Sequence, residues 1–472
     1  MRILVLNPPA FRNRDYIREG RCMQTKSSWA ALWMPLSLCY IAAVLRKGGH
    51  QVKLTDAIAS RMNNDRIVRD NASFDPQLII LNTAIPSIKG DMECASILKK
   101  AFPQVKIAVT GVFPSIYENE SLEAYPQIDY AIMDEPEWIS ERLPEIIEGN
   151  CSPESVKGLI FRKGNEIIVN ERQNLGANNL DELPFPARDL LDNNKYRLPT
   201  NGQKFTLLSV GRGCPSGCIF CVANLYYGRK FRKRSTEKII REIEQCINDF
   251  GIRNFLFWGE SFTSDPQYGE EICDEIIRNN IKITWSTTTR VDTLNEGLLT
   301  KMKQAGCELL GLGIESCDQV VLDNACKGIT VEQIVRAVQM TKDAGIKTMG
   351  HFIFGLPGDT RESARSSVRF ACKNLDYAQF YAAIPYPHTV LGRLAVENQW
   401  IEESDHSKFD LTEAVMGNGT LSAKEIRELR DYAYRRFYVR PKMLLRALRE
   451  VTSFRAFFSV LNFVKWIKPS RK

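Results

Sequence analysis

The 472-residue sequence contains no uninterrupted run of about 18 apolar residues, so we expect no segment of it to span a bilayer as a helix. Met1 leads directly into the strand-like segment 2–6, without the charged and apolar regions of a signal peptide. The 13 cysteines are odd in number and do not follow the spacing of a disulfide-bonded scaffold. These absences lead us to expect a cytoplasmic protein in a reducing compartment.

Positive charge is concentrated near the carboxyl end. The net charge is +7, yet residues 424–472 contain 14 Lys or Arg against 4 Asp or Glu. Beyond Pro441, apolar residues alternate with basic ones in a helical rhythm, namely Phe454, Phe457, Phe458, Leu461, Val464 and Trp466. Such a stretch can cap a neighbouring domain with its apolar face or lie on an anionic membrane surface, and both interpretations stay open. No nucleic-acid-binding motif accompanies the basic residues, so nucleic acid is the least favoured partner.

The length predicts two or three domains. Residues 1–150 alternate short apolar strands, at 4–6, 52–54, 78–81 and 107–109, with amphipathic helices at 35–47 and 88–100. This pattern is typical of a Rossmann-like parallel sheet, whose ligands lie beyond the carboxyl ends of the strands. Residues 151–196 contain a hairpin-like segment and the prolines Pro184 and Pro186, and we expect them to form a linker.

Strands and helices alternate again over residues 197–404. Helices are predicted at 235–250, 266–279, 296–305 and 330–344, and strands at 254–257, 282–286, 309–314 and 348–354. Repeated units of this kind predict a partial (β/α) TIM barrel, which gathers its reactive loops at the carboxyl ends of the strands. Residues 405–472 are expected to form a basic helical carboxyl-terminal region, beginning with the capping box Ser422-Ala-Lys-Glu425.

Three cysteines, Cys214, Cys218 and Cys221, form a Cys-x3-Cys-x2-Cys triplet after the apolar run 205–210. Three thiolates on one loop can hold three irons of a 4Fe-4S cluster and leave the fourth iron open to a substrate or cofactor. A structural zinc site would need a fourth Cys or His at a similar short spacing, and the following residues up to 250 offer only Cys246. The triplet therefore favours an iron–sulfur cluster.

The triplet resembles the signature of the radical S-adenosylmethionine (SAM) superfamily, in which the open iron chelates SAM. In that superfamily an electron from an external donor of flavodoxin or ferredoxin type reaches the cluster, and cleavage of SAM releases a 5′-deoxyadenosyl radical. Later segments resemble the SAM-contacting elements of the superfamily in the expected order. The resemblance assigns Gly259 and Glu260 to the SAM amino group, Ser286 to the ribose or carboxylate, Arg290 to the carboxylate, and Glu315 to the adenosyl group. Arg290 as a structural ion-pair partner remains an alternative.

The loops of the first domain together resemble the cobalamin-binding domain of one large branch of this superfamily. The resemblance implies cobalamin contacts at Asn7, Thr83, Gly111 and Glu135. Val112-Phe113 and Asp134 depart from the commoner Gly-Pro-His-Pro and Gly-Glu-Pro-Glu forms of two of these loops. No Asp-x-His-x-x-Gly motif offers a histidine to cobalt, so the resemblance implies cobalamin without a protein histidine on its lower face. A domain that has lost its ligand is the alternative.

The resemblance covers about residues 1–400 and is to the group that contains the anaerobic magnesium-protoporphyrin monomethyl ester cyclase, hopanoid-modifying enzymes and carbon methyltransferases. It implies an enzyme that cleaves SAM reductively and modifies an unactivated carbon of a small-molecule substrate, by methyl transfer or by radical rearrangement or cyclisation. The relatives and the aromatic, basic tail suggest a large apolar substrate. Two alternatives stay open: methylthio transfer to tRNA, although Cys22, Cys39 and Cys94 lack the spacing of a second cluster, and a non-enzymatic cobalamin sensor with a structural cluster.

Overall fold

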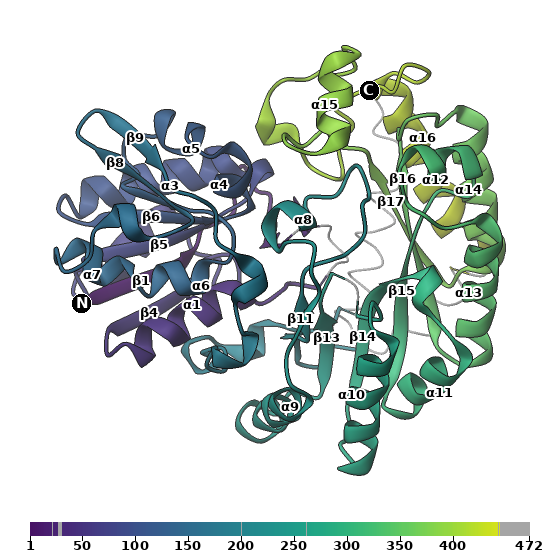
Figure 1. The fold of residues 1–472 in the computed structure, drawn as a ribbon, viewed down its shortest axis with the longest axis horizontal. Coiled ribbons are helices and arrows are strands. Elements are labelled where there is room, and N and C mark those ends of the chain that lie inside the picture. The colour runs from purple at the N-terminus through teal and green to yellow at the C-terminus, as the bar shows by residue number, and fades with distance from the viewer. Residues whose placement is uncertain (21, 27–30, 200, 261, 442, 444–472) are drawn as a thin grey trace. The chain divides into compact units, whose positions relative to one another are not determined.

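A computed structural model, drawn in Figure 1, describes the chain except residues 21, 27–30, 200, 261, 442 and 444–472. Contacts between Cα atoms divide the chain into two compact units. The first contains Met1–Lys26, Trp33–Lys195 and Val222–Gly228, and the second contains Ser27–Leu32, Tyr196–Cys221 and Arg229–Lys472. The predictions for the aromatic, basic tail lie outside the described residues.

The first unit is built on a seven-stranded sheet with the order β4-β1-β5-β6-β7-β8-β9. Its five parallel strands are β1 (Arg2–Asn7), β4 (Gln51–Asp56), β5 (Leu78–Thr83), β6 (Lys106–Gly111) and β7 (Tyr130–Ile132). All six residues of β5 are buried, as expected for a parallel strand covered on both faces. The helices of this unit are α1 (Leu36–Lys47), α2 (Asn64–Asn71), α3 (Ile88–Ala101), α4 (Val112–Tyr117), α5 (Glu120–Glu123), α6 (Pro136–Ser140), α7 (Leu143–Ile147) and α8 (Ala223–Tyr226).

Residues 151–196, expected as a linker, contribute two strands to this sheet. β8 (Leu159–Lys163) pairs antiparallel with both β7 and β9 (Glu166–Val169). The guanidinium of Arg162, on β8, donates hydrogen bonds to the carbonyl oxygens of Ile128 and Tyr125, which lie just before β7. The hairpin was predicted from the sequence, but its attachment to the sheet was not. A further hairpin of β2 (Tyr16–Glu19) and β3 (Cys22–Thr25) was not anticipated.

The second unit contains a six-stranded, all-parallel sheet with the order β10-β13-β14-β15-β16-β17. Its strands are β10 (Phe205–Ser209), β13 (Asn254–Trp258), β14 (Thr284–Arg290), β15 (Cys307–Glu315), β16 (Lys347–Phe354) and β17 (Tyr377–Ala382). Its helices are α9 (Thr236–Phe250), α10 (Pro266–Arg278), α11 (Glu296–Gln304), α12 (Gln319–Asn324), α13 (Val331–Asp343), α14 (Arg361–Asn374), α15 (Val390–Glu397) and α16 (Ala423–Tyr438). Figure 1 shows α9, α10, α11, α13 and α14 arranged along one side of this curved sheet.

The strands of this sheet alternate between buried and half-buried residues. In β16 and β17 every second residue is buried, whereas the residues between them, such as His351 and Tyr381, are half-buried. Buried residues of these strands, Phe352 and Phe380 among them, belong to one apolar core with residues of the outer helices. The alternation therefore separates a helix-covered face from a more open one. This arrangement agrees with the predicted partial barrel.

Helix signals in the sequence are confirmed at several positions. The Thr330 and Ser422 capping boxes open α13 and α16, and α9 ends at Gly251, which has a left-handed φ of 63°. The apolar residues of α16, including Ile426 and Phe437, belong to the core of the second unit. α16 is thus an integral helix of this unit. Among the helices that the structure describes, none is long and apolar enough to cross a membrane.

Candidate cofactor sites

The cysteine triplet lies on a loop that follows β11 (Gly211–Arg212), a short strand paired with β12 (Arg232–Lys233). Cys214 is buried, Cys218 and Cys221 are half-buried, and none of the three forms a disulfide bond. The loop backbone is held at Ile219, whose N–H donates to the carbonyl oxygen of Ala325 (3.2 Å) and whose carbonyl oxygen accepts from the N–H of Leu391 (3.0 Å). Residues next to α12 and within α15 therefore fix the middle of this loop.

The chemistry of three free thiols on a fixed loop suits a cluster in which each thiolate ligates a different iron. Among the described residues, no three His, Cys, Asp or Glu side chains converge on a single metal ion. Burial raises the pKa of the Cys218 thiol, and the positive charges of Lys327 and Arg290 oppose that shift. Since iron binds the thiolate, the metal would displace the Cys218 proton, and the two cations would favour that exchange.

Arg290, at the end of β14, uses most of its guanidinium within the protein. Its Nε and Nη2 each donate to Asp292 at 2.8 Å, and Nη2 also donates to the carbonyl oxygen of Lys327 at 2.7 Å. The remaining nitrogen, Nη1, lies 3.9 Å from the sulfur of Cys218. The sequence assigned this guanidinium to the SAM carboxylate, with a structural ion pair as the alternative. The structure shows the ion pair, and a guanidinium nitrogen facing the cysteine loop.

Glu315, the last residue of β15, forms a buried ion pair that the sequence analysis missed. Nζ of Lys327 lies 2.7 Å from Oε1 of Glu315, and both side chains are less than 10% exposed. Burial alone would lower the pKa of Lys327, but Glu315 and Cys218 together more than offset this effect and the pKa is raised. Glu315 has a left-handed φ of 62°, and the β15–β16 register shifts between Gly313 and Glu315. Such backbone strain is typical of functional sites.

The other predicted SAM contacts lie on the same side of the sheet but at different depths. Gly259 and the buried Glu260 directly follow β13, which neighbours β14 in the sheet. Ser286 lies on β14 four residues before Arg290, which places it about 13 Å farther down the strand on the same face. The structure therefore gathers Gly259, Glu260, Arg290 and Glu315 at the carboxyl edge of the sheet, with Ser286 deeper.

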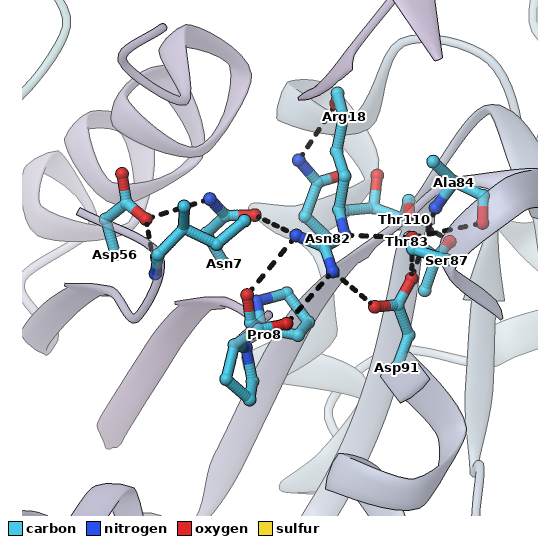
Figure 2. A network of polar contacts seen from close by, with 12 residues as sticks. Asn7, Pro8, Arg18, Asp56, Asn82, Thr83, Ala84, Ser87, Asp91 and Thr110 are labelled. Atoms are coloured by element: carbon cyan, nitrogen blue, oxygen red, sulfur yellow. Dashed lines mark hydrogen bonds and ion pairs between the residues drawn. The ribbon is translucent and has the colours of Figure 1, made fainter. Parts of the chain in front are cut away.

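The first unit has its own polar network at the carboxyl edge of its sheet, shown in Figure 2. Nδ2 of Asn7 donates to Asp56 (2.9 Å), and Oδ1 of Asn7 accepts from Nη1 of Arg18 (3.1 Å). The hydroxyl of Thr83 donates to the carbonyl oxygen of Thr110 (2.6 Å). Two predicted cobalamin contacts, Asn7 and Thr83, are thus tied into the protein and support the edge.

Arg18, from the unexpected β2–β3 hairpin, is the centre of this network. Its Nη2 lies 2.7 Å from Asp91, its Nε donates to Ser87 at 3.0 Å, and its Nη1 also donates to the carbonyl oxygen of Pro8 at 3.2 Å. The side chains of Arg18 and Asp91 are 1% and 0% exposed. Burial raises the pKa of Asp91, and Arg18 opposes that rise. The hairpin therefore anchors the loops after β1 and β5.

Next to this network, two buried polar atoms lack hydrogen-bond partners among the described residues: Oδ1 of Asn82 and Oγ1 of Thr110. Gly111 follows Thr110 with φ of 106°, and a Cβ there would lie 2.1 Å from the carbonyl oxygen of Thr83 and 2.9 Å from Oδ1 of Asn82. Only glycine fits this position. An edge with a glycine floor and two unpaired polar atoms suits a ligand that brings hydrogen-bonding groups, such as the amides around the corrin ring of cobalamin.

Glu135, the fourth predicted cobalamin contact, is buried and accepts a hydrogen bond from Nδ2 of Asn178 (3.2 Å). The preceding Asp134 has a left-handed φ of 60° and accepts from Nη1 of Arg172 (2.6 Å) and the N–H of Gln173 (3.2 Å). Where the commoner loop has glycine, aspartate therefore keeps the same backbone conformation and gains an ion pair. Segment 172–178, expected to be an inert linker, holds this loop.

Comparisons with known proteins follow the same division of the chain. The family model of the radical SAM superfamily matches residues 208–371, and that of the B12 binding domain matches residues 27–143. An uncharacterized methyltransferase of Pyrococcus horikoshii is 30% identical over 417 residues, which cover 88% of this chain and 90% of the relative. The anaerobic magnesium-protoporphyrin IX monomethyl ester cyclase of Cereibacter sphaeroides is 26% identical over 87% of this chain and 68% of the cyclase.

Among solved structures, the cobalamin-dependent SAM radical enzyme OxsB, with aqua-cobalamin and SAM bound, superposes with a TM-score of 0.75 at 16% identity, over 98% of this chain and 70% of OxsB. A Rossmann-like sheet followed by a partial barrel with a cysteine triplet defines a class of α/β enzymes. This chain belongs to the cobalamin-binding branch of the radical SAM superfamily. It is an enzyme of that branch, and its cofactors are a 4Fe-4S cluster, SAM and cobalamin. The sensor and tRNA methylthiotransferase alternatives are not better supported.

Proposed function

We propose that this enzyme methylates an unactivated carbon of a small-molecule substrate and that Cys214, Cys218 and Cys221 hold its cluster. The observation that carries the assignment of the cluster is the charge around the loop: Arg290 lies 3.9 Å from Cys218, and Lys327 is buried beside Arg290. Two cations suit a cluster bound by three thiolates. Methyl transfer is favoured over cyclisation because the relative that is 30% identical is named a methyltransferase.

The residues around the cluster would bind and orient SAM. Gly259 and Glu260 would meet the SAM amino group, Glu315 the adenosyl group, and Ser286 the deeper part of the open face. Arg290, held by Asp292 and by the carbonyl oxygen of Lys327, would act mainly as a fixed positive charge. When bound, the cluster supplies the electron that cleaves SAM, and cobalamin supplies the methyl group.

In the first unit, Gly111 would keep the end of β6 close to Thr83 and Asn82, at the edge where cobalamin would bind. Asn82 and Thr110 would hydrogen-bond the ligand, and Asn7, Thr83 and Glu135 would position the surrounding loops through the bonds described above. None of the four histidines lies at the carboxyl end of a strand in this sheet. His50 lies just before β4, at the amino end of that strand. We therefore assign no histidine to cobalt.

Anaerobic reconstitution with iron, sulfide and cobalamin tests this proposal. The protein is incubated with SAM and a reductant, and 5′-deoxyadenosine and S-adenosylhomocysteine are counted. Both products are expected from a methyltransferase. Deoxyadenosine alone would instead indicate rearrangement or cyclisation. If cluster-loaded protein formed neither product, the proposal would be contradicted.

We assign the electron donor to a protein of flavodoxin or ferredoxin type with an acidic surface. Pro215 and Gly217 in the cysteine loop are exposed, as are Arg229 and Lys230. Nη2 of Arg229 lies 3.7 Å from where a Cβ on Gly217 would be. Positive charge therefore borders an exposed part of the cysteine loop, where an acidic donor could approach closely.

The sequence of the tail is the sole support for two further proposals. The first is a peripheral membrane contact, and the second is a large apolar substrate that the enzyme reaches at the membrane. A truncation that tests the membrane contact must end after Met443, because α16 and Met443 belong to the core of the second unit. The full chain is expected to float with anionic liposomes and the truncated chain to stay in solution. Equal behaviour of the two would contradict the membrane contact.

A further inference from the structure

Lys327 was not assigned a role by its sequence, yet it is among the most constrained cations of the second unit. Its Nζ binds Oε1 of Glu315 at 2.7 Å, and its carbonyl oxygen accepts from Arg290 at 2.7 Å. Its side chain is 6% exposed. Both the backbone and the side chain of Lys327 are therefore fixed between two residues at the predicted SAM site.

On β15, the absence of a side chain at Gly313 leaves room for the ammonium group of Lys327. A Cβ on Gly313 would lie 2.9 Å from Nζ of Lys327 and 3.0 Å from Oε1 of Glu315. Any larger residue at this position would force the ends of both side chains to shift. Directly after Gly313 the pairing with β16 shifts, and Glu315 adopts its left-handed φ of 62°. The backbone around Glu315 is thus strained in the conformation that places this carboxylate.

A buried ion pair is a weak source of stability. Removing two charges from water costs several kcal/mol per ion, which is about what their attraction returns, and well-packed apolar residues often serve as well. A strained and desolvated pair is therefore better explained by a requirement for the carboxylate itself. The ammonium group of Lys327 donates a hydrogen bond to Oε1 of Glu315. Because a carboxylate offers about four acceptor sites, Glu315 can accept further hydrogen bonds from a ligand.

We propose that Lys327 is a positioning residue of the SAM site, which holds the Glu315 carboxylate oriented to accept hydrogen bonds from the nucleoside part of SAM. The inference rests on the proposed function, because it takes SAM as the ligand at this edge. Lys327 contacts Glu315 and not SAM. Its effect on binding is therefore transmitted by the carboxylate.

A double-mutant cycle separates this role from a structural one. The variants are Lys327→Met, Glu315→Gln and the combination, each loaded with its cluster and checked for iron content. SAM affinity is measured by equilibrium dialysis, and stability by thermal unfolding. Each single variant leaves one buried charge unpaired and should unfold at a lower temperature, whereas the double variant should recover most of the loss.

SAM affinity should behave differently from stability. We expect both single variants and the double variant to bind SAM roughly 10- to 100-fold more weakly, because all of them lose or misplace a charged acceptor. If affinity recovers together with stability in the double variant, the pair is structural and the inference is wrong. Unchanged SAM affinity in Lys327→Met would also overturn it.

The matched control is Lys301→Met, which removes a half-exposed lysine paired with Glu270 and Asp274 on the outer helices. This variant should bind SAM as the unmodified enzyme does. Failure of the proposed function is distinguishable, because the unmodified, cluster-loaded enzyme would then not bind SAM. Should a single variant not fold, the double variant can still overturn the inference, because it lacks any unpaired charge and normal SAM binding by it would show that the carboxylate is not needed.

Discussion

The carboxyl edges of the two sheets are both formed by parallel strands, but they differ in how their charged side chains are used. In the first unit two buried charges, those of Arg18 and Asp91, are joined to each other at 2.7 Å and tie loops together. At the same edge Gly111 and the oxygens of Asn82 and Thr110, which have no hydrogen-bond partner among the described residues, carry no charge. In the second unit Arg290 and Lys327 are also paired, with Asp292 and Glu315, but their positive charges lie close enough to Cys218 to oppose the rise of its thiol pKa.

The difference follows from the ligands. A thiolate-bound cluster and the charged amino and carboxylate groups of SAM require fixed opposite charges, whose effect is strongest where water is excluded. A corrin is large and presents many amides, so its site needs shape and hydrogen bonds more than charge. Both parallel sheets offer a carboxyl edge, and side-chain chemistry decides what each edge binds.

The largest expected effect separates the two edges. Cys218→Ala should reduce bound iron to near background after anaerobic reconstitution, because the cluster loses one of three protein ligands. Cobalamin binding should persist, since the first unit keeps its network. Cys326→Ala, which removes an exposed cysteine outside the triplet, is the control and should retain iron. Loss of cobalamin together with iron in Cys218→Ala would show that the two sites are not independent.

The converse variant is Gly111→Val. A Cβ at this position would lie 2.1 Å from the carbonyl oxygen of Thr83, so the edge must distort. Bound cobalamin, measured by its visible absorbance after gel filtration, should be nearly lost while iron content is unchanged. Gly149→Val is matched, because Gly149 also has a positive φ, of 78°, but open space around it. If the Gly149 variant lost cobalamin equally, backbone strain alone would explain the result.

The Arg18–Asp91 pair tests whether charge in the first unit is only structural. Arg18→Met leaves a fully buried carboxylate unpaired and should cost ~3–5 kcal/mol of unfolding free energy. The pKa of Asp91 is already raised by burial, and loss of Arg18 raises it further. The folded state then holds the proton more tightly than the unfolded chain, so the contribution of Asp91 to stability is greatest below a pH of about 3.9 and is lost as the pH rises through the folded-state pKa.

Melting temperatures measured across pH check this expectation. The combination Arg18→Met with Asp91→Asn, which has no carboxylate to titrate, should lose the added pH dependence. A decrease in melting temperature that is equal at all pH values would show that packing, not charge, dominates at this pair.

The general architecture was predictable because it depends on periodicity. Apolar strands such as 78–81 and capping signals such as Thr330 are local features, and the structure confirms them. The cysteine triplet was readable for the same reason, since its chemistry depends on spacing within one loop. The SAM and cobalamin contacts stay predictions, although the structure places most of them at the expected edges.

The roles of residues that act through partners distant in the sequence could not be predicted from the sequence. Lys327 looks like a surface lysine between two helices, and only the fold buries it against Glu315. Arg18 lies on a hairpin without a sequence signal and contacts Asp91, 73 residues away. Segment 172–178 resembled a linker because its role is to hold Asp134 and Glu135 by hydrogen bonds, and such contacts leave no periodic pattern.

The smallest expected effect concerns the charge outside the second site. Reversing the exposed pair with Arg229→Glu and Lys230→Glu should slow cluster reduction by flavodoxin by roughly 10-fold at low salt, because an acidic donor is no longer attracted to the cysteine loop. The difference should shrink near 1 M salt, where the screening length is about 3 Å. Arg435→Glu with Arg436→Glu reverses two exposed charges on α16 and is the control. Reduction by dithionite should be alike in all three proteins, and a slow dithionite reaction in the Arg229 and Lys230 variant would mean that the cluster itself was altered.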